Sequence, residues 1–270
     1  AEASSCAPRG FFQVIRHLSP HDPLLGLVVG HGYVAANIGG RAAFSRPEYD
    51  FWVSDQNDTA TAFFCRTGET LYLCGAPSQL EEVTEFALAV GFCHLITDWA
   101  LPLEQDSPLL AMEYGGALPE IDPPSSMQIS DCTSEKFSSM DFANFQLQSH
   151  GLATRQEAEH YAVSLSHELR HGCATVLSAQ IDGQLAVGAT LSRLYHGTVV
   201  LGAVAVLPQY RGRGLAAAIS SAACGLAVSR GQLPLLCCTP ELCALYTKAG
   251  FLPAAPLYCY KPQMKGHLPK

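Results

Sequence analysis

The sequence predicts two mixed α/β units joined by a short linker. Its 270 residues correspond to about two domains of average size. Segment 116–126 contains three prolines and two serines, which neither a helix nor a central strand accommodates. On both sides of this segment, apolar runs of strand length alternate with segments of helical periodicity. We therefore expect an α/β (α+β) chain with a first unit at residues 1–115 and a second unit at residues 127–270.

Composition excludes several classes of protein. An apolar fraction of 48% with 15% charged residues excludes intrinsic disorder as the main state. A net charge of −8 argues against a protein that coats nucleic acid or an anionic membrane. The charge is uneven, with a net −11 over residues 1–125 and +3 over residues 126–270. A bound anion is therefore expected in the second unit.

The cysteines indicate a reducing compartment. Eleven cysteines are scattered along the chain without any C-x-x-C pair, which disfavours a disulfide framework or a zinc ribbon. The early apolar run at residues 23–39 is interrupted by His31 and by glycines and is too short to span a bilayer. No basic-then-apolar signal peptide is evident. A cytoplasmic location is therefore expected.

Local patterns predict the elements of the first unit. Strands are expected at residues 50–53, 61–65 and 70–75, the last two joined by a turn. Ser78 and Glu81 have the spacing of a capping box, which predicts a helix from residue 78 to residue 92. Further strands are expected at residues 94–98 and 109–114.

The second unit follows a similar order. Helices are expected at residues 134–148 and after a second capping box formed by Thr154 and Glu157. The pair Asp182-Gly183 predicts a hairpin turn between strands. The remaining elements are expected as strands at 173–180, 184–192, 198–207, 234–238 and 257–260, and as helices at 214–230 and 241–249. The two halves share the order of their elements but not their residues, which is compatible with an internal duplication.

A glycine-rich loop at residues 209–216 follows an apolar strand and precedes a helix. Gly212 and Gly214 permit close approach of a ligand to the backbone, and the helix N-terminus contributes partial positive charge. Arg211 and Arg213 add full positive charge. The loop therefore predicts a phosphate-binding site.

Gly212-x-Gly214-x-x-Ala217 also matches the dinucleotide-binding fingerprint. In that motif the first glycine follows its strand directly, and an acidic residue about 20 positions later holds the ribose. Here residues 208–211 intervene, and no Asp or Glu occurs between residues 183 and 240. A dinucleotide site is therefore disfavoured.

Two motifs in this region resemble the GNAT acetyltransferase superfamily. Arg211, Gly214 and Ala216 match its phosphate motif, which is Gln or Arg, two residues, Gly, one residue, then Gly or Ala. About 30 residues later, the run from Leu245 to Phe251 resembles the Leu-Tyr-x-Lys-x-Gly-Phe signature of the family. The resemblance extends over residues 127–261. It implies a mixed-sheet GNAT acyltransferase fold and, given the similar halves, two tandem GNAT-like units.

The resemblance also implies a donor substrate and its site. Acetyl-CoA would be the acyl donor, with no metal required. The implied coenzyme-binding residues are Val204, Ala205 and Val206 for the pantetheine arm, and Arg211, Gly212, Arg213, Gly214, Leu215, Ala216 and Ala217 for the pyrophosphate. Tyr246 is implied as the acid that protonates the leaving thiolate, since a phenol has a pKa near that of a thiol. The alternative for Tyr246 is a core aromatic on a short helix.

The implied reaction is direct transfer of the acetyl group to an amine acceptor within a ternary complex. The chain departs from the family pattern because strand 198–207 has no Glu to act as a base, and Thr239 stands where an Asn is common. His196 and Glu168 are left as candidate bases by elimination, together with bulk water. The missing Glu also keeps open a non-catalytic acyl-CoA sensor.

A zinc hydrolase is the remaining alternative, because His167-Glu168-x-x-His171 spells H-E-x-x-H on an expected helix. Gly172 is expected to end that helix directly after the second histidine. Arg170 interrupts the usual uncharged spacing, and no third ligand follows at a familiar distance. We therefore expect no metal site.

The first unit is expected not to bind coenzyme A. Its strand at residues 70–75 leads into Ala76-Pro77-Ser78, and its helix begins with acidic residues that repel phosphate. We expect it to be a degenerate partner that borders the acceptor site or mediates assembly. The expected partners are acetyl-CoA and an unidentified amine, without nucleic acid or membrane, and a homodimer is left open.

Overall fold

The computed structural model describes residues 13–28, 32–44, 46, 48–56, 59–77, 79–116, 128–131, 137–149 and 151–262. Most of the expected linker, together with His31 and Ser78, lies outside these residues. The described chain is mixed α/β, as the sequence predicts. No helix in this part of the chain has the length and apolar character needed to cross a membrane.

The first half of the chain forms six strands, two helices and one 3₁₀ turn. They are β1 (Gln13–Leu18), η1 (Pro23–Leu27), α1 (Tyr33–Phe44), β2 (Tyr49–Gln56), β3 (Thr59–Thr67), β4 (Thr70–Gly75), α2 (Leu80–Val90), β5 (His94–Thr97) and β6 (Gln105–Tyr114). Gln79, rather than Ser78, is the N-cap of α2, so this helix begins later than the capping-box pattern predicts.

The second half repeats this order and adds a short helix. Its elements are β7 (Gln128–Asp131), α3 (Ser139–Gln148), α4 (Arg155–Arg170), β8 (Ala174–Ile181), β9 (Gln184–Tyr195), β10 (Thr198–Val206), η2 (Pro208–Tyr210), α5 (Leu215–Ser229), β11 (Leu233–Cys238), η3 (Pro240–Leu242), α6 (Cys243–Lys248) and β12 (Phe251–Tyr260). The predicted capping box of α4 is confirmed, because Thr154 and Glu157 exchange both hydrogen bonds. The hairpin turn is also confirmed, with positive φ at Asp182 and Gly183.

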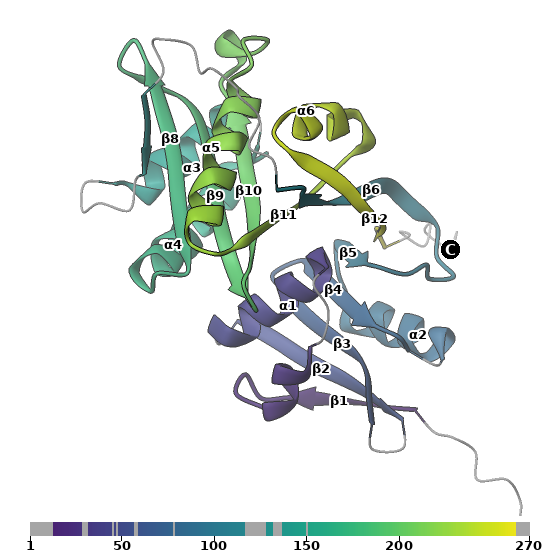
Figure 1. The fold of residues 1–270 in the computed structure, drawn as a ribbon. Helices are drawn as coiled ribbons and strands as arrows, with labels where there is room; N and C mark the ends of the chain where they lie inside the picture. The colour runs from purple at the N-terminus through teal and green to yellow at the C-terminus, as the bar shows by residue number, and fades with distance from the viewer. Residues whose placement is uncertain are drawn as a thin grey trace, which may run out of the picture.

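All twelve described strands form one continuous sheet in the order β1-β2-β3-β4-β5-β12-β6-β11-β10-β9-β8-β7. Neighbours are antiparallel except for the pairs β4/β5 and β10/β11, which are parallel. The order is symmetric about its centre. From one end, β1 to β5 of the first half are followed by β12 of the second half; from the other end, β7 to β11 of the second half are followed by β6 of the first half. Strand β12 therefore lies among first-half strands, and β6 lies beside β11 (Figure 1). The two halves complete each other's sheets by exchanging one strand.

Helix α1 lies where the two halves meet (Figure 1). Its residues from Tyr33 to Ala42 are all buried. It contacts β3 and β4 on one side and β9, β10 and β11 of the second half on the other. A Cβ on Gly39 would lie 2.4 Å from the ring of Tyr195, so a glycine is required for this close packing. Burial on all sides explains why the sequence shows no amphipathic pattern here.

Candidate active site

The glycine-rich loop turns the chain from β10 into α5. Gly212 and Gly214 have φ of 75° and 76°, a left-handed conformation that glycine adopts without a steric penalty. The first intrahelical hydrogen bond of α5 runs from the Ala218 N–H to the Gly214 carbonyl. The helix therefore does not use the N–H groups of residues 215–217, and they are available to an anion.

Strands β10 and β11 diverge beside this loop. They pair only between residues 198–200 of β10 and residues 233–235 of β11. Beyond that point β11 pairs with β6 alone, and β10 pairs with β9 alone. A β-bulge between Gly202 and Ala205, with Ala203 at φ 49°, accompanies the divergence. The backbone of residues 204–206 therefore has no strand partner on its β11 side.

A buried glutamine on α3 holds this bulge. Gln146 is 3% exposed, and its Nε2 donates a 2.7 Å hydrogen bond to the Ala203 carbonyl. The Gln146 carbonyl in turn accepts hydrogen bonds from the Ser149 hydroxyl and from the Gly151 N–H. The bulge is thus fixed to the segment that follows α3. No sequence motif marks Gln146, because it acts on a strand nearly sixty residues away.

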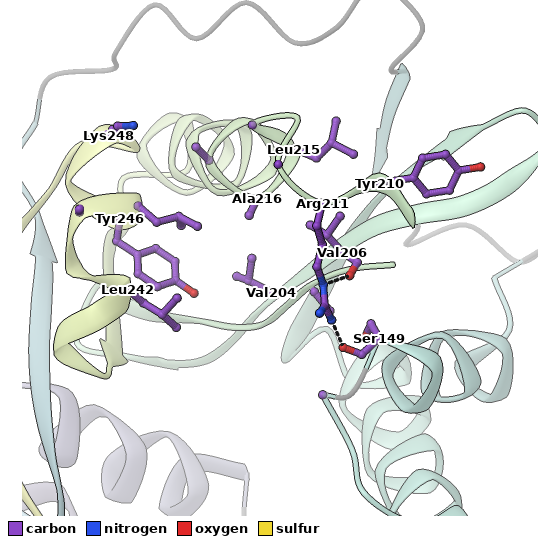
Figure 2. A pocket seen from close by; sticks show the side chains of 17 residues that line it. Ser149, Val204, Val206, Tyr210, Arg211, Leu215, Ala216, Leu242, Tyr246 and Lys248 are labelled. Carbon is purple, nitrogen blue, oxygen red and sulfur yellow. Dashed lines mark hydrogen bonds between the residues drawn. The ribbon is translucent and has the colours of Figure 1, made fainter. Parts of the chain in front are cut away.

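The loop, the diverging strand and α6 surround one cavity of about 590 Å³ (Figure 2). Ten of the predicted site residues line it: Val204, Ala205, Val206, Arg211, Gly212, Gly214, Leu215, Ala216, Ala217 and Tyr246. Sequence reasoning missed seven further lining residues, namely Ser149, Gly151, Tyr210, Leu242, Ala244, Leu245 and Lys248. The two motifs recognised in the sequence therefore meet at one cavity.

The two loop arginines differ in position. Arg211 lines the cavity and donates hydrogen bonds to the carbonyls of Ser149 (2.8 Å) and Val206 (3.2 Å), as Figure 2 shows. It thereby ties the loop to the end of α3. Arg213 does not line the cavity, and its guanidinium stacks on the ring of Tyr210 at 5.3 Å. Among the described residues of the lining, Arg211 and Lys248 are the cationic side chains, and none is Asp, Glu or His.

Tyr246 lies on α6 with its ring directed into the cavity (Figure 2). The ring packs against Phe251 with centroids 6.2 Å apart. Burial raises the pKa of Tyr246 to about 12. The phenol is therefore protonated at neutral pH and can donate a proton, but burial places its pKa above that of a thiol, so the pKa match expected from the sequence does not hold.

Neither candidate base lies at this cavity. His196 is exposed in the turn before β10, whereas the cavity lies at the other end of that strand. Glu168 lies on α4 and lines a separate cavity. The cysteines beside α6 do not replace them, since burial raises the pKa of Cys238 to about 11 and keeps its thiol protonated.

The H-E-x-x-H histidines form an aromatic cluster. The rings of His167 and His171 lie 4.5 Å apart, and both pack edge-on against Phe44. Helix α4 ends at Arg170, directly before the second histidine. Loss of solvent, reinforced by the charge of His171, lowers the pKa of His167. Within the described residues, no group of three or more His, Cys, Asp or Glu side chains is placed to hold a metal ion.

Solved structures share this fold over both halves of the chain. A tandem GNAT protein from the clavulanic acid biosynthesis pathway aligns with a TM-score of 0.62 and 14% identity, covering 93% of this chain and 98% of its own. A GNAT-family acetyltransferase from Colwellia psychrerythraea gives 0.60 and 14%, covering 92% and 100%. A GCN5-related N-acetyltransferase from Sphaerobacter thermophilus gives 0.60 and 14%, covering 92% and 95%. The fold class is therefore that of two tandem GNAT units.

The family assignment comes from the second half. Residues 140–251 match the model of the acetyltransferase (GNAT) family. No curated protein matches the chain in sequence. The matched segment lies in the second half and contains the lining residues of the cavity described above.

Proposed function

We propose that the second unit binds acetyl-CoA in the 590 Å³ cavity and transfers the acetyl group to an amine acceptor within a ternary complex. The observation that carries this proposal is that the phosphate-type loop and the Tyr246 segment line the same cavity, beside the diverging strands. The division into units at 1–115 and 127–270 is part of this proposal; the described lining of the cavity belongs to the second unit, and each unit borrows a strand from the other.

The lining fits the donor chemically. The free N–H groups at the start of α5 and the cations Arg211 and Lys248 suit a pyrophosphate. No acidic side chain in the lining opposes its charge. The unpaired backbone of residues 204–206 suits the amide groups of a pantetheine arm. In this proposal Arg213 contributes only long-range charge, because its side chain lies against Tyr210.

The donor supplies a thioester that is activated toward acyl transfer. The acceptor nitrogen forms a bond to the acetyl carbon as the carbon–sulfur bond breaks, and Tyr246 gives its phenolic proton to the departing sulfur. The nitrogen loses one proton, which returns to the phenolate through water. The described residues of the lining include no carboxylate or imidazole, so in this proposal the acceptor enters as the neutral amine or loses its proton to water.

The first unit acts in this proposal as a degenerate partner without a coenzyme site. A cytoplasmic location is supported by the nine described cysteines, which are all free thiols. A non-catalytic acyl-CoA sensor is the second candidate, and it is favoured because no described residue of the lining is a carboxylate or an imidazole.

Calorimetric titration with acetyl-CoA tests the proposal. Wild type should bind, and Gly214→Glu should weaken binding at least about a hundredfold, because it places bulk and negative charge at the start of α5. Gly231→Glu is the matched control, since Gly231 has a similar φ of 70° just beyond the end of the same helix. Equal loss in both variants would trace the effect to backbone strain.

An assay of thiol release over a panel of amines separates the two candidates. Release that depends on an amine supports the transferase. Tight binding without amine-dependent release supports the sensor. A well-folded wild type that binds no acetyl-CoA would refute both.

A further inference from the structure

Helix α1 carries a buried charge that no described carboxylate neutralises. Arg41 is 6% exposed within an otherwise mostly apolar helix. Its Nη1 donates 2.8 Å hydrogen bonds to the backbone carbonyl and to the Oδ1 of Asn37, and its guanidinium stacks on Tyr72 at 4.6 Å. Within the described residues, its Nε and Nη2 donate no hydrogen bond, and it forms no ion pair. A guanidinium so deeply buried normally has an anionic partner.

Arg41 lines a cavity of about 140 Å³ between the two units. By volume, this space holds about five water molecules at the density of the liquid, or a compact small ligand. Its lining joins the end of α1 to the end of α4: Gly40, Arg41, Ala43, Phe44, Tyr49, Glu168, Gly172 and Cys173. We call this space the Arg41–Glu168 cavity.

Glu168 gives the cavity its second charge. It is half-buried, it comes from the second unit, and among the described residues it forms no ion pair. Arg41 and Glu168 therefore face the same space without pairing with each other. A simple anion would be repelled by Glu168, and a simple cation would be repelled by Arg41. A ligand with both charges satisfies both side chains.

The Arg41–Glu168 cavity is separate from the proposed coenzyme site. The two linings share no residue. Cys173 precedes β8, whose first residue pairs with Ser192 of β9. The coenzyme cavity lies beside Ala205 of β10, which pairs with Gly188 of β9. These two points on β9 are about 14 Å apart along the strand.

We propose that the Arg41–Glu168 cavity binds a small zwitterion of the α-amino acid class, with its carboxylate at Arg41 and its ammonium group at Glu168. The rings of Phe44 and Tyr49 in the lining favour a compact apolar side chain. Because one charge comes from α1 and the other from α4, the ligand bridges the two units. The inference does not depend on acetyl transfer.

Calorimetry and thermal unfolding with each of the twenty L-amino acids, without acetyl-CoA, test this site. At least one small apolar amino acid should bind saturably and raise the unfolding temperature. Butyrate, which has only the carboxylate, and propylamine, which has only the ammonium group, should bind at least about tenfold more weakly.

Two substitutions on α4 form a matched pair. Glu168→Gln should lower the affinity for the amino acid at least about tenfold. Glu159→Gln, an exposed residue of the same helix that pairs with Arg155, should leave the affinity unchanged. Arg41→Lys keeps the positive charge but removes the planar guanidinium that can donate two hydrogen bonds to a carboxylate, and it should also weaken binding. If this variant does not fold, the Glu168→Gln comparison still decides the question.

Binding must also survive Gly214→Glu, which alters only the coenzyme cavity. Three results would overturn the proposal: no amino acid binds, Glu168→Gln binds as tightly as wild type, or Gly214→Glu abolishes binding. The last result would place the amino acid in the coenzyme cavity instead. A wild type that binds an amino acid but no acetyl-CoA would refute only the proposed function.

Discussion

The two units share a strand order but differ where a parallel strand pair leads into a helix. In the second unit the loop after β10 has two positive-φ glycines and borders a cavity of about 590 Å³. In the first unit the end of β4 borders a cavity of about 250 Å³. Its lining contains no basic residue: Leu24, Leu27, Thr59, Ala60, Thr61, Phe63, Cys74 and Gly75. Equivalent topology therefore does not provide an equivalent anion site.

Three local features account for this difference. The helix after β4 begins with Glu81 and Glu82, whereas the first turn of α5 has no acidic residue. Strand β10 contains a bulge, whereas β4 pairs with β3 without a register shift. The second unit places α6 between its last two strands, whereas β5 and β6 are joined without a helix. The site thus depends on a loop, a bulge and a short helix added to a shared scaffold.

The largest expected effect concerns the helix that only the second unit has. Tyr246→Phe should lower kcat by about 10²–10⁴-fold, because it removes the proposed acid. The dissociation constant for acetyl-CoA should change little, since the ring remains. Steady-state kinetics and calorimetry measure the two quantities. A variant with wild-type kcat would show that the leaving thiolate needs no protein acid.

The pH dependence should show whether a base acts in the second unit's cavity, where the described lining residues supply none. With the Tyr246 pKa at about 12, the acid is protonated throughout the neutral range and is lost only in strong alkali. The value of kcat/KM should therefore rise about tenfold per pH unit until the pKa of the acceptor amine is passed, and then level off. A plateau that sets in well below that pKa would reveal a protein base. The pH profile of kcat/KM should be measured with two amines of different pKa, because the plateau should then shift with the pKa of the amine.

A smaller effect is expected from the bulge of β10, which β4 does not share. Gln146→Leu leaves the partly buried Ala203 carbonyl without its donor, which costs about 1 kcal/mol. We expect about tenfold weaker acetyl-CoA binding together with a lower unfolding temperature. The control is Gln148→Leu, an exposed position at the end of the same helix. Unchanged coenzyme affinity in Gln146→Leu would show that the bulge does not shape the site.

The smallest effect is expected in the first unit. Replacing Glu81 and Glu82 together by Lys reverses the charge at the start of α2 but supplies neither glycine loop nor bulge. Acetyl-CoA should still bind with a stoichiometry of one. Calorimetric stoichiometry measures this directly. A second bound equivalent would mean that charge alone separates the two units.

Three features of the second unit could be predicted from its sequence because each depends on local chemistry. The capping box at Thr154, the hairpin turn at Asp182 and the loop around Gly214 each depend on neighbouring residues, and the structure contains all three features. The contributions of Gln146 and Ser149 could not be predicted, since they reach the site through hydrogen bonds to residues about sixty positions away in the sequence. The stacking of Arg213 on Tyr210 likewise depends on three-dimensional packing.

The first unit was harder to predict for a physical reason. Helix α1 is buried on all sides, so its sequence lacks the polar stripe that marks a surface helix. The expected closing strand at residues 109–114 does form, as part of β6, but its neighbours are β12 and β11. Pairing across the middle of the sheet depends on contacts between distant segments, and a strand pattern does not specify its partner.

The exchange of β6 and β12 has a consequence for synthesis on the ribosome. Strand β5 can gain its second neighbour only after Phe251–Tyr260 has been translated, although the rest of its unit is complete much earlier. Until then the nascent chain exposes an open strand edge, which is a template for aggregation. We therefore expect the protein to depend on chaperones during translation, and either half expressed alone to aggregate.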